Sequence, residues 1–333
     1  MKTTGARLLL KCILNQNIKI LFGVPGESYL SILDALNDFP EIHWIGARQE
    51  GGASFMAAGF AQLTGKTGIC FVTRAPGATN ASIGIHTAFQ GSIPLILFIG
   101  QVSSTVKGRE AFQELDYKEM FSGMAKWVTE VNDVKRIPEI MARAFNVANS
   151  GRPGPVIVSL PEDIISSICN INPIPKIKFS EPSVSSQDLL EIKEKLNTAE
   201  KPIVIVGGTG WSEEGKKHFK NFVENNNLPV ISSFRRQDIF DNNSLSYVGV
   251  SSFGNSKYLN QALEEADLIF AFNVLLGDVA TNNYRLWSVP ISEIFLIHSH
   301  SAAIELGKVY YPNLPINSGP NNLALELNKL GKI

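Results

Sequence analysis

The chain has 333 residues, and its 30 lysines and arginines nearly balance its 31 aspartates and glutamates, giving a formal net charge of −1. This balance lacks the basic excess that binding to a nucleic-acid backbone requires, so we predict no nucleic-acid partner. Three cysteines without a C-x-x-C spacing argue against a disulfide framework or a structural zinc site and fit a reducing compartment.

The first residues along the chain, "MKTTGARLLLKCILNQ", interrupt their apolar positions with charges. This pattern predicts an amphipathic helix and differs from the apolar core of a signal peptide. The longest apolar stretch of note, "IPLILFIG" at residues 93–100, is far shorter than the roughly 20 residues that a membrane helix needs. We therefore expect a cytoplasmic protein that does not interact with a membrane.

Short β-rich runs alternate with amphipathic segments in the first half of the chain. The predicted strands are "IKILFGV", "HWIGA", "GICFVT", "IPLILFIG" and "PGPVIVSLP", and the predicted helices include residues 28–38, 50–63 and 133–149. Continuous apolar strands in such an alternation predict a parallel sheet covered by helices on both faces. Ligands bind such sheets in the loops that follow the strand ends.

The stretch "CNINPIPKIKFSEPSVSS" at residues 169–186 has three prolines and neither a helical nor a strand period, so we predict an interdomain linker. A second alternation follows, with helices "LLEIKEKL" and "EEGKKHFKNFVENN" and strands "PIVIVGG", "LPVISS", "ADLIFAF" and "EIFLIHS". The predicted fold class is therefore α/β, with two doubly wound parallel-sheet domains at residues 1–168 and 187–333.

Three loops of the first domain each follow a predicted strand and precede a helix: "FGVPGES", "RQEGG" and "VTRAPGATNAS". Gly26 can bring the backbone close to a ligand, although a turn needs glycine and proline in any case. In the third loop, Pro76 and Gly77 are predicted to form the turn, with Thr79 or Asn80 available as a helix cap. Because the three loops would meet at one sheet edge, their combination favours a binding site.

Glu50 opens a segment, "EGGASFMAAGF", that otherwise has the composition of a buried helix. The helix dipole alone would favour an acid in a first turn. However, acidic side chains are rarely buried without a partner, so this carboxylate needs one. Phe55, Met56 and Phe60 in the same segment are predicted to be core residues and not substrate contacts.

Several motifs agree in order and spacing with one known family: "FGVPG", "RQEGGASFMAAGFAQLTGKTGICFVTRAPGATN", "IPLILFIGQV", "GREAFQE" and "SGRPGPVIVSLPED". Over residues 3–165 the chain resembles the pyrimidine-binding domain of thiamine-diphosphate enzymes of the acetolactate synthase and pyruvate oxidase family. Residues beyond the linker resemble the Rossmann-like central domain of that family more loosely. The chain ends where a third, diphosphate-binding domain would begin, so we expect that domain to be absent.

The resemblance implies that Glu50 is the catalytic acid that shares a proton with the cofactor's aminopyrimidine ring. It further implies residues that border the cofactor, and two that face the thiazolium and substrate from a neighbouring subunit. The implied cofactor-binding residues are Pro25, Gly26, Glu50, Thr73, Pro76, Gly77, Asn80 and Gln113, and the implied substrate residues are Phe112 and Gln113. The implied reaction is decarboxylation and carboligation of a 2-keto acid.

The expected cofactor is thiamine diphosphate, with Mg²⁺ bound only through the missing domain. Neither "GDVATNN" at residues 277–283 nor the pair His298 and His300 is predicted to bind a metal. In "VGGTGWSEEG" a glutamate, Glu213, stands where a dinucleotide motif needs its third glycine, which disfavours a nicotinamide site. The resemblance leaves open whether FAD or ADP binds the central domain.

Two interpretations of the whole chain remain open. In the first, the chain forms a homodimer, or pairs with a subunit that carries the diphosphate-binding domain. In the second, it is a non-catalytic, truncated paralogue that acts as a structural or regulatory partner. Within the catalytic interpretation, another 2-keto acid decarboxylase or an oxidase is an alternative to acetolactate synthesis.

Overall fold

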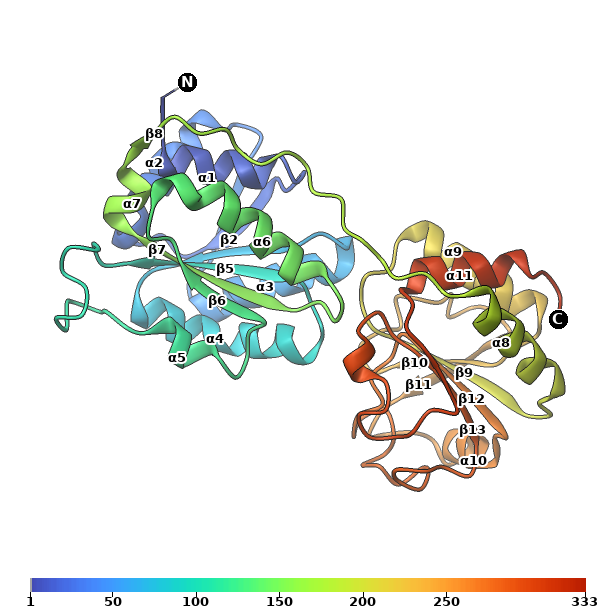
Figure 1. Cartoon of the computed structure of the whole chain (residues 1–333). Coiled ribbons are helices and arrows are strands. Elements are labelled where there is room, and N and C mark those ends of the chain that lie inside the picture. The colour runs from blue at the N-terminus through green and yellow to red at the C-terminus, as the bar shows by residue number, and fades with distance from the viewer. Residues whose placement is uncertain (1) are drawn as a thin grey trace. The chain divides into compact units, whose positions relative to one another are not determined.

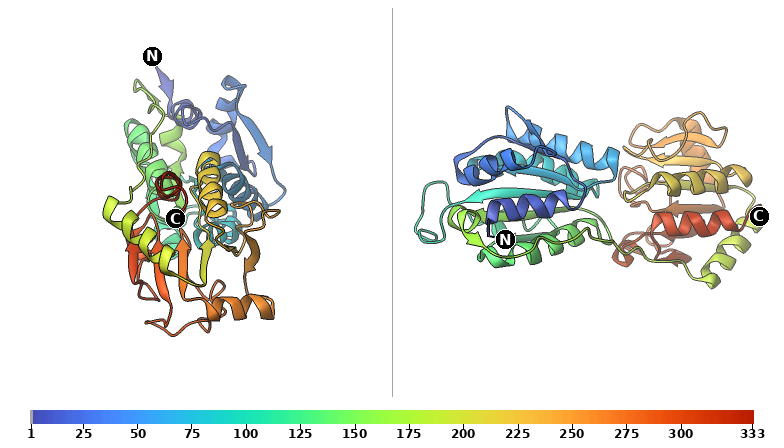
Figure 2. Two further views of the ribbon diagram at one scale, coloured as in Figure 1. Left: turned by 90° about the vertical axis from the view of Figure 1, so that its right-hand side faces the viewer. Right: turned by 90° about the horizontal axis from the view of Figure 1, so that it is seen from above.

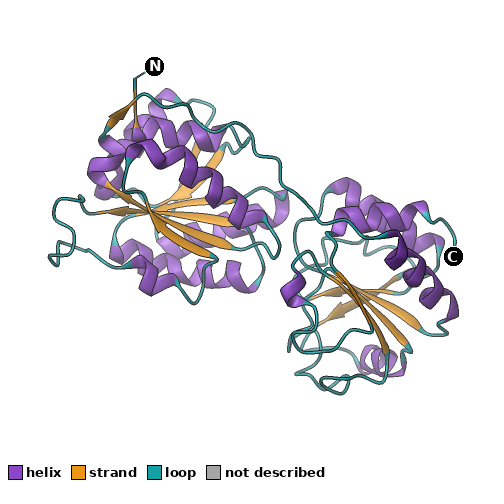
Figure 3. Ribbon diagram, viewed as in Figure 1, coloured by secondary structure: helices purple, strands orange, loops and turns teal. Residues whose placement is uncertain are grey.

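The computed structural model describes residues 2–333, which form two units that meet between Phe179 and Ser180. Each unit contains one six-stranded parallel sheet (Figure 1). Helices cover both faces of each sheet (Figures 2 and 3). The predicted fold class of two doubly wound α/β domains is therefore confirmed, and the boundary falls inside the stretch predicted as a linker.

The sheet of the first unit has the strand order β3-β2-β4-β5-β7-β6, and all its neighbouring strands are parallel. These strands are β2 (Ile20–Gly23), β3 (His43–Gly46), β4 (Gly68–Val72), β5 (Leu95–Gln101), β6 (Trp127–Glu130) and β7 (Pro155–Pro161). The central strands β4, β5 and β7 are buried along their whole length, as their continuous apolar sequences predict.

Two hydrophobic clusters fill the space between this sheet and its helices. The first includes residues of α1, α2 and α6, and the second includes residues of α3, α4 and α5. The helices of the unit are α1 (Gly5–Leu14), α2 (Leu30–Ala35), α3 (Glu50–Thr64), α4 (Ala75–Gln90), α5 (Tyr117–Phe121), α6 (Ile137–Asn149) and α7 (Glu162–Ser166).

A small antiparallel sheet closes the first unit, because β1 (Thr3–Thr4) pairs with β8 (Ile168–Cys169). The segment that follows β8 has no regular structure, yet side chains at the end of α1 bind it. Asn15 Nδ2 donates to Ile174 O over 2.7 Å, and Gln16 Nε2 donates to Pro175 O over 2.9 Å. The first part of the proline-rich stretch therefore packs on the first unit.

The sheet of the second unit has the strand order β11-β10-β9-β12-β13-β14, also fully parallel. Counted along this unit, the order is 3-2-1-4-5-6, which is that of dinucleotide-binding folds. The strands are β9 (Pro202–Val206), β10 (Val230–Ser233), β11 (Tyr247–Ser251), β12 (Leu268–Phe272), β13 (Phe295–Ser299) and β14 (Leu314–Ile316). The helices are α8 (Ser186–Thr198), α9 (Glu213–Asn225), α10 (Lys257–Glu265) and α11 (Pro320–Lys329).

No helix within residues 2–333 combines the length and apolarity needed to cross a bilayer. The same part of the chain contains no cluster of three metal-ligating side chains. His298 is buried, and its Nε2 lies 2.9 Å from Val274 O. The Nδ1 of His300 accepts a hydrogen bond from Ala302 N, so both rings have structural contacts.

Candidate active site

The strand order of the first sheet reverses between β2 and β4, and a ligand crevice in such folds lies outside the carboxyl ends of the strands at that point. The loop after β2 carries Pro25 and Gly26, and the loop after β4 carries Thr73. The connection from β3, which neighbours β2, ends at Glu50. The structure thus brings together at one sheet edge the three loops that the sequence suggested.

The loops after β2 and β4 touch at Gly26 and Thr73. A Cβ added to Gly26 would lie only 2.6 Å from Thr73 Cβ, so this position excludes any larger residue. The Thr73 hydroxyl lies 3.0 Å from the hydroxyl of Ser28, a fully buried residue. The Tyr29 hydroxyl donates to Val24 O within the same loop. These contacts fix the backbone that borders the crevice.

Glu50 is the first residue of α3 and is half-buried. The preceding residue, Gln49, caps the helix by accepting a hydrogen bond from Gly52 N over 3.0 Å, so the Glu50 carboxylate is not needed as the cap. Instead, its Oε2 accepts a hydrogen bond from Asn80 Nδ2 over 2.9 Å. Its Oε1 lies 3.4 Å from the place that a Cβ at Gly77 would take.

No ion pair involves Glu50 within residues 2–333, and its Oε1 accepts no hydrogen bond there. Arg74, in the loop after β4, forms an ion pair with Glu162, the first residue of α7. Burial, aided by the Glu50 charge, raises the pKa of the Cys70 thiol, and burial also raises the pKa of the Tyr29 hydroxyl. Oε1 is therefore a carboxylate oxygen that can still accept a hydrogen bond.

The prediction that Thr79 or Asn80 caps a helix is wrong. Helix α4 begins at Ala75, so Pro76 and Gly77 lie in its first turn and not in a turn that precedes it. Proline is tolerated there because the first helical N–H groups have no intrahelical acceptor. The Thr79 hydroxyl donates back to Ala75 O over 2.7 Å. Asn80 lies on the face of α4 that meets Glu50.

The expectation that Phe55 and Met56 are core residues is also wrong, since they are 43% and 38% exposed. Small residues of α3 face the sheet instead, with Ala53 and Ala57 fully buried. Phe60 does pack on the core, with its ring centroid 5.9 Å from that of Phe22.

Phe112 and Gln113 lie in the long loop between β5 and α5. The Phe112 side chain is 75% exposed. Gln113 has a positive φ of 63°, and its carbonyl accepts a hydrogen bond from Ala75 N, the first residue of α4. The loop therefore reaches the carboxyl-end edge of the sheet through the Gln113 backbone, while the Phe112 ring points into solvent.

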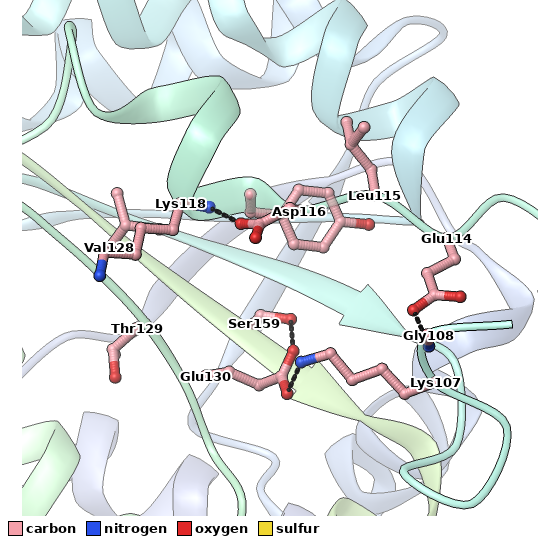
Figure 4. A pocket seen from close by; sticks show the side chains of 11 residues that line it. Lys107, Gly108, Glu114, Leu115, Asp116, Lys118, Val128, Thr129, Glu130 and Ser159 are labelled. Carbon is pink, nitrogen blue, oxygen red and sulfur yellow. Dashed lines mark hydrogen bonds and ion pairs between the residues drawn. The ribbon is translucent and has the colours of Figure 1, made fainter. Parts of the chain in front are cut away.

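A cavity of about 470 Å³ lies under this loop (Figure 4). The Glu114 carboxylate accepts hydrogen bonds from Gly108 N over 2.6 Å and Ala111 N over 3.1 Å, and the Gly108 bond lowers the pKa of this carboxyl. Lys107 forms an ion pair with Glu130 at the end of β6. These contacts hold the loop that carries Phe112. They were not predicted from the sequence, although the acid that ends "AFQE" indicates a contact of this kind.

The Glu50–Asn80 contact can be tested through stability, without any ligand. In a double-mutant cycle with Glu50→Ala and Asn80→Ala, each of which removes one partner of the hydrogen bond, we expect a coupling free energy of about 0.5–1.5 kcal/mol, because a half-exposed carboxylate–amide hydrogen bond contributes modestly. Urea unfolding of the two single variants and the double variant gives this value. A coupling of zero would mean that the two side chains do not interact.

Two family models match the chain. "Thiamine pyrophosphate enzyme, N-terminal TPP binding domain" matches residues 3–120, and "Thiamine pyrophosphate enzyme, central domain" matches residues 189–327. The first match contains the three loops of the candidate site and the Phe112–Gln113 loop, and the second lies wholly within the second unit.

Similar proteins include two acetolactate synthase large subunits that are 33% identical to this chain, from Buchnera aphidicola subsp. Schizaphis graminum and from Lactococcus lactis subsp. lactis. Each match covers 99% of this chain and 58% of the relative. The acetolactate synthase isozyme 3 large subunit of Escherichia coli is 37% identical over 292 residues, which are 84% of this chain and 50% of that protein. The chain thus spans little more than half the length of these relatives.

Proposed function

Because the chain belongs to the family of thiamine pyrophosphate enzymes, we propose that its first unit binds the pyrimidine half of thiamine diphosphate and supplies Glu50 as the activating acid. In this proposal the reaction is the decarboxylation and carboligation of a 2-keto acid, of the acetolactate synthase type. The observation that carries the proposal is the free Oε1 of Glu50 beside Gly77.

The residues fit the cofactor's ring. Gly77 carries no side chain beside Glu50 Oε1, which leaves room for a flat aromatic ring, and Gly26 lets the loop after β2 pack directly against Thr73. Pro25, Thr73 and Pro76 complete the proposed border.

The chemistry needs a proton that moves between Glu50 and a ring nitrogen. When bound, thiamine diphosphate supplies the nucleophilic carbon that 2-keto acid decarboxylation requires. Glu50 holds the proton at Oε1, while the Asn80 amide fixes Oε2 and so sets the direction in which Oε1 points. In a partly desolvated site, a hydrogen bond between Glu50 Oε1 and the ring nitrogen would offset the free-energy cost of burying the carboxyl group.

The diphosphate end of the cofactor and its Mg²⁺ need groups other than those of the first unit. We propose that a further domain supplies them, either from sequence beyond these 333 residues or from another subunit, and that the site forms between two chains. Phe112 and Gln113 then face the thiazolium and substrate of a neighbouring chain. The 75% exposure of Phe112 supports this, since a ring held out in solvent is available to a partner.

Calorimetry with thiamine diphosphate and Mg²⁺ tests the proposal, with this chain alone and with the chain mixed with a subunit that carries the diphosphate-binding domain. We expect binding at least tenfold tighter in the mixture, followed by pyruvate consumption. A mixture that neither bound the cofactor nor consumed pyruvate would contradict the catalytic proposal and favour the non-catalytic paralogue. Cofactor binding and turnover of a different 2-keto acid would retain Glu50 in its role and change only the substrate.

A further inference from the structure

The turn between β9 and α9 occupies the place where dinucleotide-binding folds receive a pyrophosphate. In those folds the first helix presents its free N–H groups to the phosphates, and glycines let the ligand approach. The second unit has the matching strand order and the glycine-rich sequence "VGGTGWSEEG". Whether a flavin or adenine nucleotide fits therefore depends on what surrounds this turn.

The N-terminus of α9 already has an internal partner. Asn321 Oδ1 accepts hydrogen bonds from Ser212 N over 2.8 Å and from the Ser212 hydroxyl over 3.0 Å. The same hydroxyl accepts from Gly215 N over 3.0 Å. A Cβ placed on Gly215 would overlap Asn321 Oδ1, so the carboxamide lies directly against the first turn. The Asn321 carboxamide thus fills the space in which a phosphate oxygen would lie.

Glu181 holds Asn321 in this position. Its Oε1 accepts from Asn321 N over 2.7 Å and from Asn322 N over 3.3 Å, which caps the N-terminus of α11. Its Oε2 accepts from Asn321 Nδ2 over 3.2 Å, and the same amide donates to Gly210 O over 2.8 Å. The Glu181 carboxylate therefore caps α11 and, through Asn321, fills the space at the N-terminus of α9.

The opposite side of the turn is closed by other side chains. Trp211 Nε1 donates to Gly207 O over 2.9 Å, and Asn273 Nδ2 donates to Thr209 O over 3.1 Å. Arg236 donates to Gly208 O and forms a two-bonded ion pair with Asp238, with both distances at 3.0 Å. Arg236 is only 7% exposed, so the arginine nearest the turn is already neutralised inside the protein.

The charges at this edge disfavour an anion. Glu213 and Glu214 lie in the first turn of α9 with their side chains 90% and 83% exposed. Together with Glu181 they place three carboxylates around the position of a pyrophosphate. These negative charges repel a bound anion. Lys216, which pairs with Glu213, offsets only part of this repulsion.

We propose that the Glu181 carboxylate and the Asn321 carboxamide occupy the phosphate position of the second unit from within the chain, so that this unit binds neither FAD nor ADP. The second unit then acts as a scaffold that needs no nucleotide. This inference is independent of the role proposed for Glu50, because it concerns only residues 180–333.

Flavin content and nucleotide binding of the purified full chain test the first part of the proposal. We expect no flavin absorbance in the visible range, no retention of FAD or ADP in equilibrium dialysis at 1 mM ligand (about 100 times a Kd near 10 μM), and no rise in Tm with either ligand. Bound FAD or ADP in a one-to-one ratio would overturn the proposal, whatever the outcome of the thiamine diphosphate experiment.

Hydrogen–deuterium exchange of two variants tests the role of Glu181. For Glu181→Gln we expect about fivefold faster exchange in the first turn of α11, because the charged cap that binds Asn321 N and Asn322 N is lost. Glu326→Gln removes the same charge from the second half of α11, where Glu326 pairs with Lys329, and should leave that first turn unchanged. Equal exchange in both variants would show that Glu181 neither caps α11 nor holds Asn321 against the N-terminus of α9.

Discussion

The Glu50→Gln variant of the reconstituted enzyme is expected to lose roughly 10²–10⁴-fold in pyruvate consumption, the range that a positioned acid–base group contributes. Glutamine keeps the size of the side chain, and its carbonyl oxygen can still accept from Asn80. It cannot hold the proton that Oε1 would share with the ring. The cofactor should therefore still bind, while exchange of its reactive carbon-bound proton becomes slow.

Two measurements separate this effect from a change in folding. Deuterium exchange at the reactive carbon of the bound cofactor, followed by NMR, reports proton transfer directly, and calorimetry reports cofactor affinity. Glu41→Gln is the matched control, because Glu41 is an exposed carboxylate of the same unit whose side chain forms no hydrogen bond or ion pair within residues 2–333. If Glu50→Gln exchanged the proton within about threefold of the unaltered protein, Glu50 would not be the activating acid.

The Phe71→Ala variant is expected to lose about 3–5 kcal/mol of unfolding free energy in the first unit. Phe71 is completely buried in β4, and its ring stacks on that of Phe98 with centroids 4.7 Å apart. The rings of Tyr29 and Trp44 each lie 6.0 Å from it. Truncation removes aromatic contacts on several sides and leaves a cavity that the rigid sheet cannot close.

Hydrogen–deuterium exchange of the β4 and β5 peptides in increasing urea gives the stability of this unit separately from the second. Phe112→Ala serves as the control, since Phe112 is 75% exposed and its removal should change stability by less than about 0.5 kcal/mol. A loss below about 1.5 kcal/mol for Phe71→Ala would mean that the site repacks, and that the aromatic cluster is not a main source of stability.

The interior strands of both six-stranded sheets could be predicted from the sequence, and of their four edge strands β3 was predicted as "HWIGA". The other three edge strands, β6, β11 and β14, were not predicted. An edge strand is short and partly exposed, so polar residues interrupt the apolar run, as "WVTE" in β6 illustrates. Interior strands such as β5 are covered on both faces and therefore keep an unbroken apolar sequence.

The position of Glu50 could be predicted from the sequence, but its partner in the chain could not. The Asn80–Glu50 hydrogen bond depends on α4 beginning at Ala75, which decides the face on which Asn80 lies. The exposure of Phe55 could not be predicted from the sequence either. Helix α3 packs so closely on α4 that a Cβ at Gly84 would overlap Ser54, so small residues face inward and large ones are left outside. Close helix packing thus reverses the usual rule that large apolar residues lie inside.

The pairing of β1 with β8 has a consequence for how this fold can be combined with others. Thr3 lies opposite Cys169 and Thr4 opposite Ile168, so the first and the last strand of the first unit lie side by side, and residues 170–179 then continue over the same unit. Proteins with adjacent ends tolerate insertion into other chains and circular permutation, because joining them elsewhere does not stretch the fold. We therefore expect the first unit to keep its internal contacts when its chain is joined next to the β1–β8 pair and new ends are opened in an exposed loop.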